Sequence, residues 1–279
     1  MQDVARGREL ARGLIAQAEI ESSALERTLG RKATIAIVAG NDHDARRFVE
    51  LKRAALARVA IEIAAVWLDE GATSPEAVAV IAELNKRDDV DAIFLQFPLP
   101  TGIDAGEAAN AVVMAKDVDC SSAEAERHFL AGDGPFVPVA PQAAFDLLNH
   151  ELELTTTPTI VIAGGDDPFV RALRALLQRA GVSAHVCDSS DASLQSLPQA
   201  PAALVITDSL PDARIFDVIE ELPVLLDTGY YLPPRPEGWI PARARARIGV
   251  QLTQYGNVGP LTVAHLAQAT LTAAARRGG

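Results

Sequence analysis

The chain has 279 residues, of which 49% are hydrophobic, enough to bury the core of one large domain or of two modest ones. Its 37 acidic and 25 basic residues give a formal net charge of −12, so the average field repels nucleic acid and anionic lipid, and neither is expected as a partner. The N-terminal segment does not resemble a signal peptide, and no stretch approaches the roughly 18 apolar residues of a membrane span. We therefore expect a soluble cytoplasmic protein.

Short β-rich segments alternate with amphipathic helical segments from residue 32 to about residue 118. After a surface helix in the N-terminal segment, the pattern predicts helices at 44–59 and 74–88, the second capped by Ser74, and strands at 32–40, 61–68 and 90–100. Such alternation predicts parallel strands joined by helical crossovers.

A second series of short apolar strands begins near Thr157 and is typical of a Rossmann-type unit. Its predicted strands lie at 158–164, 183–187, 202–207 and 223–229, with a helix from about Phe169. The series join within residues 149–158, a basic run at 242–247 is expected to be solvated, and a final helix at 259–277 is expected to dock back on the first domain. The predicted fold class is α/β with two domains, residues 1–148 completed by 258–279, and residues 149–257.

Cys120 and Cys187 are far apart in sequence and have no metal-ligand spacing. The sequence therefore predicts two reduced cysteines, without a disulfide framework or a metal site.

Four ordered stretches carry a family resemblance. They read FVELK (48–52), FLQFPLP (94–100), KDVD (116–119) and GNVGPLTVA (256–264). Together they resemble the bifunctional methylenetetrahydrofolate dehydrogenase/cyclohydrolase family over nearly the whole chain, including the two-domain outline and the returning C-terminal helix. Members of that family commonly form homodimers, which the resemblance implies here too.

The resemblance also implies site residues. By position, Lys52 matches the family's lysine, Gln96 its glutamine and Asp119 its pterin-binding aspartate. Taken singly, each residue also has an ordinary structural interpretation. Lys52 could be a solvated surface lysine, Gln96 the end of a buried strand, and Asp119 the cap of a turn. The resemblance places further substrate contacts at Phe48, Pro98, Leu99, Tyr255, Gly256, Gly259, Pro260 and Thr262.

The chemistry of cyclohydrolysis explains why these residue types are grouped. Hydrolysis of a methenyltetrahydrofolate cation requires water attack on an electron-poor carbon and proton transfer as the ring opens. A lysine in a partly desolvated cleft has a lowered pKa and exchanges protons near neutrality. A glutamine orients it without adding charge, and an aspartate accepts paired hydrogen bonds from the pterin edge.

Three departures from the family pattern stand out. Phe48 replaces a tyrosine, which keeps a ring and removes a hydroxyl. Cys120 follows Asp119 where the family has glycine, and we interpret this cysteine as structural because no base partner is evident. Tyr255, Gly256 and Asn257 stand where the family has Pro-Gly-Gly.

The predicted nucleotide turn also departs from the family. It contains Gly164 and Gly165 followed by Asp166, Asp167 and Pro168. A pyrophosphate binds such a turn through free backbone N–H groups and the helix dipole. Two carboxylates, a residue without an N–H, and bulky Val170 at a glycine position all oppose that ligand.

The adenosine end of the predicted nucleotide site disfavours NADP. The segment after the second strand lacks a basic residue for a 2′-phosphate, whereas Asp188 lies near the spacing of a ribose-binding acid, which leaves NAD possible.

The sequence thus predicts a folate-dependent one-carbon enzyme with a tetrahydrofolate derivative as substrate. The first hypothesis is hydrolysis of 5,10-methenyltetrahydrofolate to 10-formyltetrahydrofolate with little or no NADP-dependent dehydrogenase activity. The alternatives are one-carbon transfer to a second substrate, an NAD-dependent dehydrogenase, and a noncatalytic folate-binding protein.

Overall fold

The computed structural model of the chain describes residues 2–3, 5–154, 158–188, 190–207, 213–229 and 238–278. Two compact units are present. One comprises residues 11–139 and 263–279, and the other comprises residues 1–10 and 140–262. Part of the predicted join, residues 155–157, lies outside the described residues.

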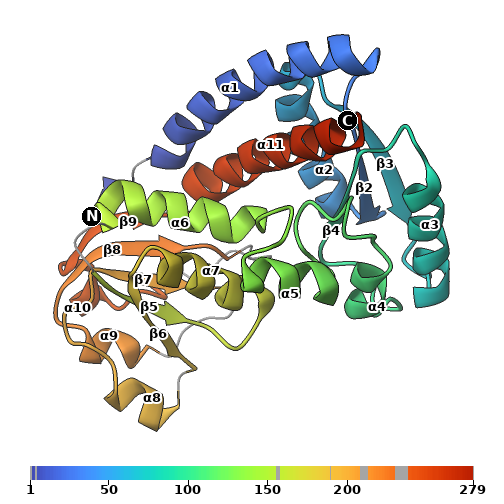
Figure 1. Cartoon of the computed structure of the whole chain (residues 1–279). Coiled ribbons are helices and arrows are strands. Elements are labelled where there is room, and N and C mark those ends of the chain that lie inside the picture. The colour runs from blue at the N-terminus through green and yellow to red at the C-terminus, as the bar shows by residue number, and fades with distance from the viewer. Residues whose placement is uncertain are drawn as a thin grey trace. The chain divides into compact units, whose positions relative to one another are not determined.

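The unit with residues 11–139 is built on a parallel sheet of three strands in the order β3-β2-β4 (Figure 1). These strands are β2 (Thr34–Gly40), β3 (Glu62–Leu68) and β4 (Ala92–Gln96). The central strand β2 reads as a continuous apolar run because helices cover both faces of a parallel sheet. The chain passes from β2 to β3 on one side of the sheet and then to β4 on the other side of β2. In parallel sheets, such a change in strand order is where ligands bind, at the carboxyl ends of the strands.

Helices surround this sheet, and the last helix of the chain lies beside the first (Figure 1). On one face, Ile93 and Leu95 of β4 pack with Ile81 and Leu84 in a buried cluster. The helices of this part of the chain are α1 (Arg6–Leu29), α2 (His43–Leu56), the 3₁₀ turn Ala57–Val59, α3 (Ser74–Lys86), α4 (Ala105–Asn110), α5 (Ala123–Ala131) and the terminal α11 (Gly259–Gly278). The expected return of the C-terminal helix to the first domain is confirmed.

The cap of α3 differs from the prediction. Thr73, not Ser74, is the N-cap residue, and the Glu76 carboxylate accepts hydrogen bonds from the Thr73 backbone N–H and hydroxyl, both at 2.9 Å. Ser74 is the first helical residue, and its hydroxyl accepts a hydrogen bond from Asp104 N. Adjacent Thr and Ser are both good caps by composition, and the glutamate three residues after Thr73 decides between them.

The other unit contains a parallel sheet in the order β1-β9-β8-β7-β5-β6. Its strands are β1 (Gln2–Asp3), β5 (Thr159–Ala163), β6 (Ser183–Cys187), β7 (Ala203–Ile206), β8 (Leu222–Asp227) and β9 (Ile248–Leu252), and its helices are α6 (Val139–Leu152), α7 (Pro168–Arg179), α8 (Asp191–Gln195), α9 (Ile215–Val218), α10 (Ala242–Arg245) and the π-helical turn Gln254–Val258. The predicted Rossmann-type sheet is confirmed, with β1 and β9 added to the strands that the sequence pattern indicates.

In the basic run before β9, Arg243 and Arg245 are exposed, as expected of a solvated run, whereas Arg247 is half-buried. The Arg247 guanidinium donates to the backbone oxygens of Ile219 and Phe216 at 2.6 and 2.8 Å, and Arg243 forms an ion pair with Asp217. These arginines fasten the entry to β9 onto α9.

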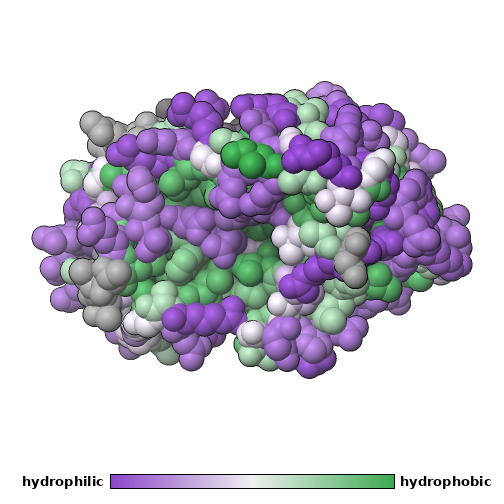
Figure 2. Space-filling view, turned by 45° about the horizontal axis from the view of Figure 1, so that its top comes forward, coloured by the Kyte–Doolittle hydropathy of each residue, from purple (hydrophilic) through white to green (hydrophobic). Residues whose placement is uncertain are grey.

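Hydrophilic residues cover most of the face in Figure 2, with apolar patches among them. In the described part of the chain, no helix is long and apolar enough to span a membrane, and no group of three or more His, Cys, Asp or Glu side chains is arranged to hold a metal ion.

Candidate active site

Helix α2 carries a lysine on its buried face. The Asp42 side chain caps the helix by accepting from the backbone N–H groups of Asp44 and Ala45 at 2.9 Å. The buried residues of α2 recur at helical spacing, and Lys52, which is 7% exposed, occupies one of the apolar positions between Val49 and Leu56. The structure therefore excludes the interpretation of Lys52 as a solvated surface lysine.

Strand β4 supplies the contacts of this lysine. Lys52 Nζ donates to Gln96 Oε1 at 2.5 Å and lies 5.2 Å from the centre of the Phe94 ring. Gln96 Nε2 donates to the backbone oxygen of Phe97 at 2.8 Å, which fixes the amide with its oxygen toward the lysine. Among the described residues, Gln96 Oε1 is the hydrogen-bond acceptor of the ammonium group, so two of its three N–H groups remain for a ligand or water.

Burial lowers the pKa of Lys52 to about 8, while the negative charge of Asp119 opposes the shift. A lysine with this pKa populates both its charged and its neutral form near neutral pH. Lys52 and Gln96, which lie 44 residues apart in sequence, thus form a hydrogen-bonded pair in which the lysine can gain or lose a proton near neutral pH.

Asp119 lies in the loop between α4 and α5, in the same unit. Its Oδ1 accepts a hydrogen bond from Val139 N at 2.8 Å. Desolvation raises the pKa of the Asp119 carboxyl to about 7, and the charge of Asp117 adds to the rise. The hydrogen bond from Val139 and the positive charge of Lys52 act in the opposite direction.

The loop that carries Asp119 is held at both ends. Asp117 accepts hydrogen bonds from the backbone N–H groups of Ser121 and Ser122 at 2.9 and 2.8 Å, which closes a tight turn around Asp119. At the other end, Lys116 O accepts from Ile93 N at 2.8 Å, so the loop begins as an extension of the sheet beside β4.

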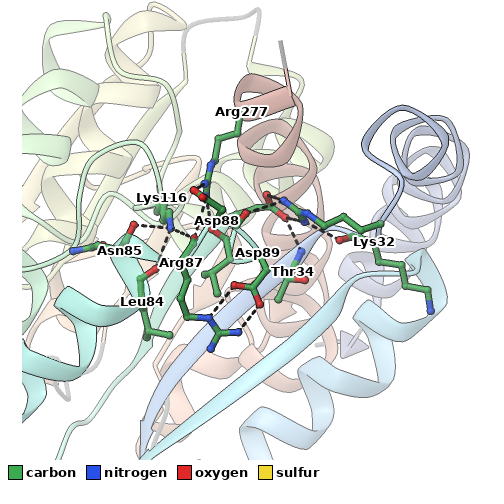
Figure 3. A network of polar contacts seen from close by, with 12 residues as sticks. Lys32, Thr34, Leu84, Asn85, Arg87, Asp88, Asp89, Lys116 and Arg277 are labelled. Carbon is green, nitrogen blue, oxygen red and sulfur yellow. Dashed lines mark hydrogen bonds and ion pairs between the residues drawn. The ribbon is translucent and has the colours of Figure 1, made fainter.

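Lys116 fastens this loop to the carboxyl end of α3 (Figure 3). Its ammonium, which is 4% exposed, donates to the backbone oxygens of Leu84, Asn85 and Arg87 at 3.0, 2.8 and 2.7 Å. All three N–H groups are thereby used, and a cation satisfies carbonyl groups that a helix C-terminus leaves open.

A second cation in Figure 3 reaches the same segment from the end of α11. The Arg277 guanidinium hydrogen-bonds the backbone oxygen of Val90 and pairs with Asp88 at 3.0 Å. Arg31 forms two hydrogen bonds of 2.7 Å with the Asp91 carboxylate. These contacts anchor the segment between α3 and β4, and with it the strand that presents Gln96.

Cys120 stands in a left-handed backbone conformation with φ of 51°. This explains why the family pattern has glycine there, because a side chain at positive φ strains the backbone. The thiol is buried and unpaired by disulfide, and its burial raises the pKa of the group, so it is protonated at neutral pH. These observations agree with the structural interpretation of Cys120.

Three further predicted substrate contacts belong to the same unit. Phe48 lies one helical turn before Lys52 and is partly buried. Pro98 is exposed and Leu99 partly buried, and the peptide bond between Phe97 and Pro98 is cis.

The remaining predicted substrate contacts belong to the other unit. Tyr255 is 58% exposed in the π-helical turn, next to Gly256, and Gly259 and Pro260 open α11. The Thr262 hydroxyl donates to Val258 O at 2.8 Å. Two groups of predicted contacts are thus described, one in each unit.

The turn after β5 is organised by its own side chains. Asp167 caps α7, and its Oδ1 accepts from Val170 N at 2.9 Å. Arg171 donates to the Asp166 backbone oxygen at 3.1 Å, and the Asp166 side chain is 81% exposed. A Cβ on Gly164 would lie 2.6 Å from the Thr207 hydroxyl, whereas one on Gly165 would meet nothing within 4 Å. Close packing against Thr207, which follows β7, therefore accounts for Gly164 without a nucleotide.

Asp188 follows β6 and is exposed. Its Oδ1 accepts from Ser190 N at 3.0 Å, and hydrogen bonds from the Ser190 hydroxyl and backbone lower the pKa of the carboxyl. An exposed carboxylate is thus available at this strand end.

Comparisons with known proteins agree with this geometry. Residues 5–119 match the model of the tetrahydrofolate dehydrogenase/cyclohydrolase catalytic domain. The chain is 27% identical over 274 residues to the bifunctional protein FolD of Acetivibrio thermocellus, which covers 97% of this chain and 96% of that protein.

Two solved structures share the fold over nearly the whole chain. The methylenetetrahydrofolate dehydrogenase-cyclohydrolase of Trypanosoma brucei, complexed with NADP and an inhibitor, has a TM-score of 0.81 and 23% identity, covering 97% of this chain and 96% of its own. The NAD-dependent methylenetetrahydrofolate dehydrogenase of Saccharomyces cerevisiae has a TM-score of 0.78 and 13% identity, covering 96% and 95%. The chain thus has the two-domain α/β fold of these two solved structures. The chain is similar to the tetrahydrofolate dehydrogenase/cyclohydrolase catalytic domain over residues 5–119 and to bifunctional FolD proteins over nearly its whole length.

Proposed function

We propose that the chain is a folate-dependent one-carbon enzyme that hydrolyses 5,10-methenyltetrahydrofolate to 10-formyltetrahydrofolate, with little or no NADP-dependent dehydrogenase activity. The observation that carries the proposal is the buried Lys52 ammonium, held by Gln96 Oε1 at 2.5 Å and having its pKa lowered to about 8. The similarity to the tetrahydrofolate dehydrogenase/cyclohydrolases suggests the substrate class.

In the proposed reaction Lys52 moves protons. Neutral Lys52 accepts a proton from a water molecule as the water oxygen bonds to the methenyl carbon of the cation. The bond between this carbon and N5 then breaks, N5 takes up a proton from the lysine, and the hydroxyl proton of the adduct leaves to solvent. The carbon stays on N10 as a formyl group, and one proton is released overall.

Other residues bind and orient in this proposal. Gln96 holds the lysine through its fixed amide oxygen, and Asp119 accepts hydrogen bonds from the amino-pyrimidine edge of the pterin. Phe48 offers a ring for stacking on the pterin. We assign these roles to the domain of residues 1–148 with 258–279. The predicted substrate contacts also include Tyr255, Gly256, Gly259, Pro260 and Thr262.

Three features of the turn after β5 support the loss of NADP. The Asp167 carboxylate already takes the Val170 N–H, Pro168 has no N–H, and Asp166 adds a carboxylate that is 81% exposed, although it pairs with Arg171 at 3.5 Å. A pyrophosphate at a helix N-terminus requires free N–H groups and a positive local field. The residues present do not fit the group, and no step of the proposed reaction uses it.

One observation favours a second candidate, an NAD-dependent dehydrogenase. Asp188 presents an exposed carboxylate after β6, as an acid that binds a ribose diol does in NAD enzymes. Saturable binding of NAD that is lost in Asp188→Ala, together with NADH formation from methylenetetrahydrofolate, would favour this candidate over the first.

The test is an absorbance time course with the full chain and 5,10-methenyltetrahydrofolate, without nucleotide, compared with buffer alone and with Lys52→Met. We expect protein-dependent loss of the methenyl chromophore that disappears in the variant. Loss no faster than in buffer, in protein that binds folate measurably, contradicts the hydrolase.

A parallel assay addresses the nucleotide. With methylenetetrahydrofolate and NADP, we expect no NADPH formation. Asp167→Ser replaces the capping carboxylate with a capping hydroxyl and so removes the charge, and it is expected to increase any residual affinity for NADP. Rapid NADPH formation by the unaltered chain contradicts the proposed loss.

A further inference from the structure

Phe94 lies under the ammonium group of Lys52, with Nζ 5.2 Å from the ring centre. Phe94 is 8% exposed and Lys52 is 7% exposed, so the contact is largely removed from water. A cation held over the face of an aromatic ring is attracted by the ring quadrupole, and the attraction is strongest where both partners are desolvated.

The period of β4 explains how one strand provides both contacts. Alternate side chains of a strand point to the same face, so Phe94 and Gln96 lie on one face of the sheet. Ile93 and Leu95 point to the opposite face, where they pack in the cluster with α3 and α4. Lys52 thus rests on the ring at one position and hydrogen-bonds the amide two residues further on.

Other charged groups around Lys52 are accounted for. Asp119 interacts with it electrostatically from the loop between α4 and α5. On α2 itself, Arg53 is engaged with Glu50 at 3.1 Å and with the Ile63 backbone oxygen at 3.3 Å. The ring and the amide are neutral, so they direct the ammonium without creating a salt bridge that would hold its proton permanently.

We propose that Phe94 is a positioning residue for Lys52, whose ring face fixes one side of the ammonium group so that its N–H groups not bonded to Gln96 are directed toward the substrate. The inference rests on the proposed function, in which Lys52 transfers the protons. The stretch FLQFPLP that carries the family resemblance begins with Phe94, but the resemblance assigns no role to this residue.

A cation–π contact and simple packing predict opposite changes. Removing the ring's attraction disfavours the charged form and lowers the pKa of Lys52 further. If the ring merely excludes water, removing it lets solvent reach the ammonium and raises the pKa toward 10.5, the ordinary value for lysine. The sign of the change therefore separates the two roles.

The experiment is an NMR titration of protein labelled with ¹³C at the lysine ε carbons. The chain has four lysines, Lys32, Lys52, Lys86 and Lys116, so the spectrum is sparse, and loss of a signal in Lys52→Met assigns the resonance. In Phe94→Leu we expect the pKa of Lys52 to fall by about 0.5 to 1 unit. Phe94→Tyr, which keeps the ring, is expected to leave it within about 0.3 unit.

Leu95→Val provides a matched control, because it alters packing on the opposite face of β4, and we expect no change in the Lys52 titration. Phe94→Met serves as the second ring-free variant if Phe94→Leu does not fold. An unchanged or raised pKa in the folded ring-free variant overturns the inference.

Kinetics provide the link to function. In Phe94→Leu we expect the pH at which kcat/KM is half-maximal to decrease with the pKa of Lys52, and kcat to fall about threefold to tenfold. In Phe94→Tyr we expect that pH and kcat to stay near the values of the unaltered chain. The titration requires no turnover, so it measures the effect of the ring on Lys52 even if the chain does not hydrolyse the methenyl substrate. Absence of hydrolysis contradicts the proposed function alone. A lowered pKa with an unshifted kinetic profile contradicts the positioning role.

Discussion

Two buried lysines in one unit are held in different ways. Lys116 gives all three N–H groups to backbone oxygens at the end of α3, whereas Lys52 meets one amide oxygen, the face of a ring and a distant carboxylate. Desolvation lowers the pKa of Lys116 to about 8, as it does for Lys52, but the Lys116 ammonium satisfies three backbone oxygens and thereby stabilises the structure around it. A partly bonded ammonium costs folding energy and keeps N–H groups available to a ligand, as an acid/base group requires.

The largest expected effect is on catalysis. Lys52→Met removes the proposed proton-transfer group, and we expect kcat/KM for methenyltetrahydrofolate to fall by about 10² to 10⁴. The same substitution removes a buried charge, so the free energy of unfolding at pH 7 is expected to rise by about 1 to 3 kcal/mol. Urea unfolding and the absorbance assay measure the two quantities. Retained activity, or a less stable variant, would place Lys52 with Lys116 as a structural lysine.

The same substitution at the other lysine should act in the opposite direction on stability. Lys116→Met leaves three carbonyl oxygens of the α3 end without their donor, and we expect a loss of about 2 to 4 kcal/mol in the free energy of unfolding. Activity per folded molecule should fall less than in Lys52→Met. Urea unfolding of both variants in one buffer provides the comparison, and a stability change of the same sign at both sites contradicts it.

The pH dependence of the reaction follows from Lys52 and Asp119. The proposed base is neutral Lys52, so kcat/KM should rise by about tenfold per pH unit below the lysine pKa of about 8 and level off above it. Protonation of Asp119, whose pKa is about 7, weakens pterin binding and steepens the fall below that pH. Initial rates corrected for buffer hydrolysis from pH 6 to 9 measure the profile, and a flat profile contradicts it.

Stability should depend on pH in the complementary way. The folded-state pKa of Asp119 is raised, so its contribution to stability is present below the unfolded value near 4 and is lost as pH rises toward 7. The folded-state pKa of Lys52 is lowered, so stability increases between pH 8 and 10.5 as the folded lysine becomes neutral. The pair is therefore most costly to the fold between about pH 7 and 8, where both groups carry charge.

Sequence patterns predicted the sheets better than the site. Strand β6 has the predicted bounds because its apolar residues stand between clear breaks, whereas β1, with only two residues, is too short to produce a pattern and depends on pairing with β9. Strand β9 was missed because an arginine run precedes it, and only the folded chain shows those arginines bonded to α9.

The site could be predicted only as single residues. The approach of Lys52 to Gln96 joins positions 44 residues apart through the crossing of α2 over the sheet, which no local spacing encodes. The resemblance named the lysine, the glutamine and Asp119. Phe94 was missed, although its position two residues before Gln96 in a strand was the available signal.

The smallest expected effect concerns Cys120, whose backbone has φ of 51°. Comparing Cys120→Gly with Cys120→Ala isolates the backbone, since both variants lose the buried thiol. Alanine normally makes a chain more stable than glycine because it restricts the unfolded state, but at positive φ the order reverses. We expect the glycine variant to unfold with a free energy about 1 kcal/mol higher than the alanine variant. Urea unfolding at one pH measures the difference, and an alanine variant of equal or greater stability would show that the turn closed by Asp117 bears no strain at this residue.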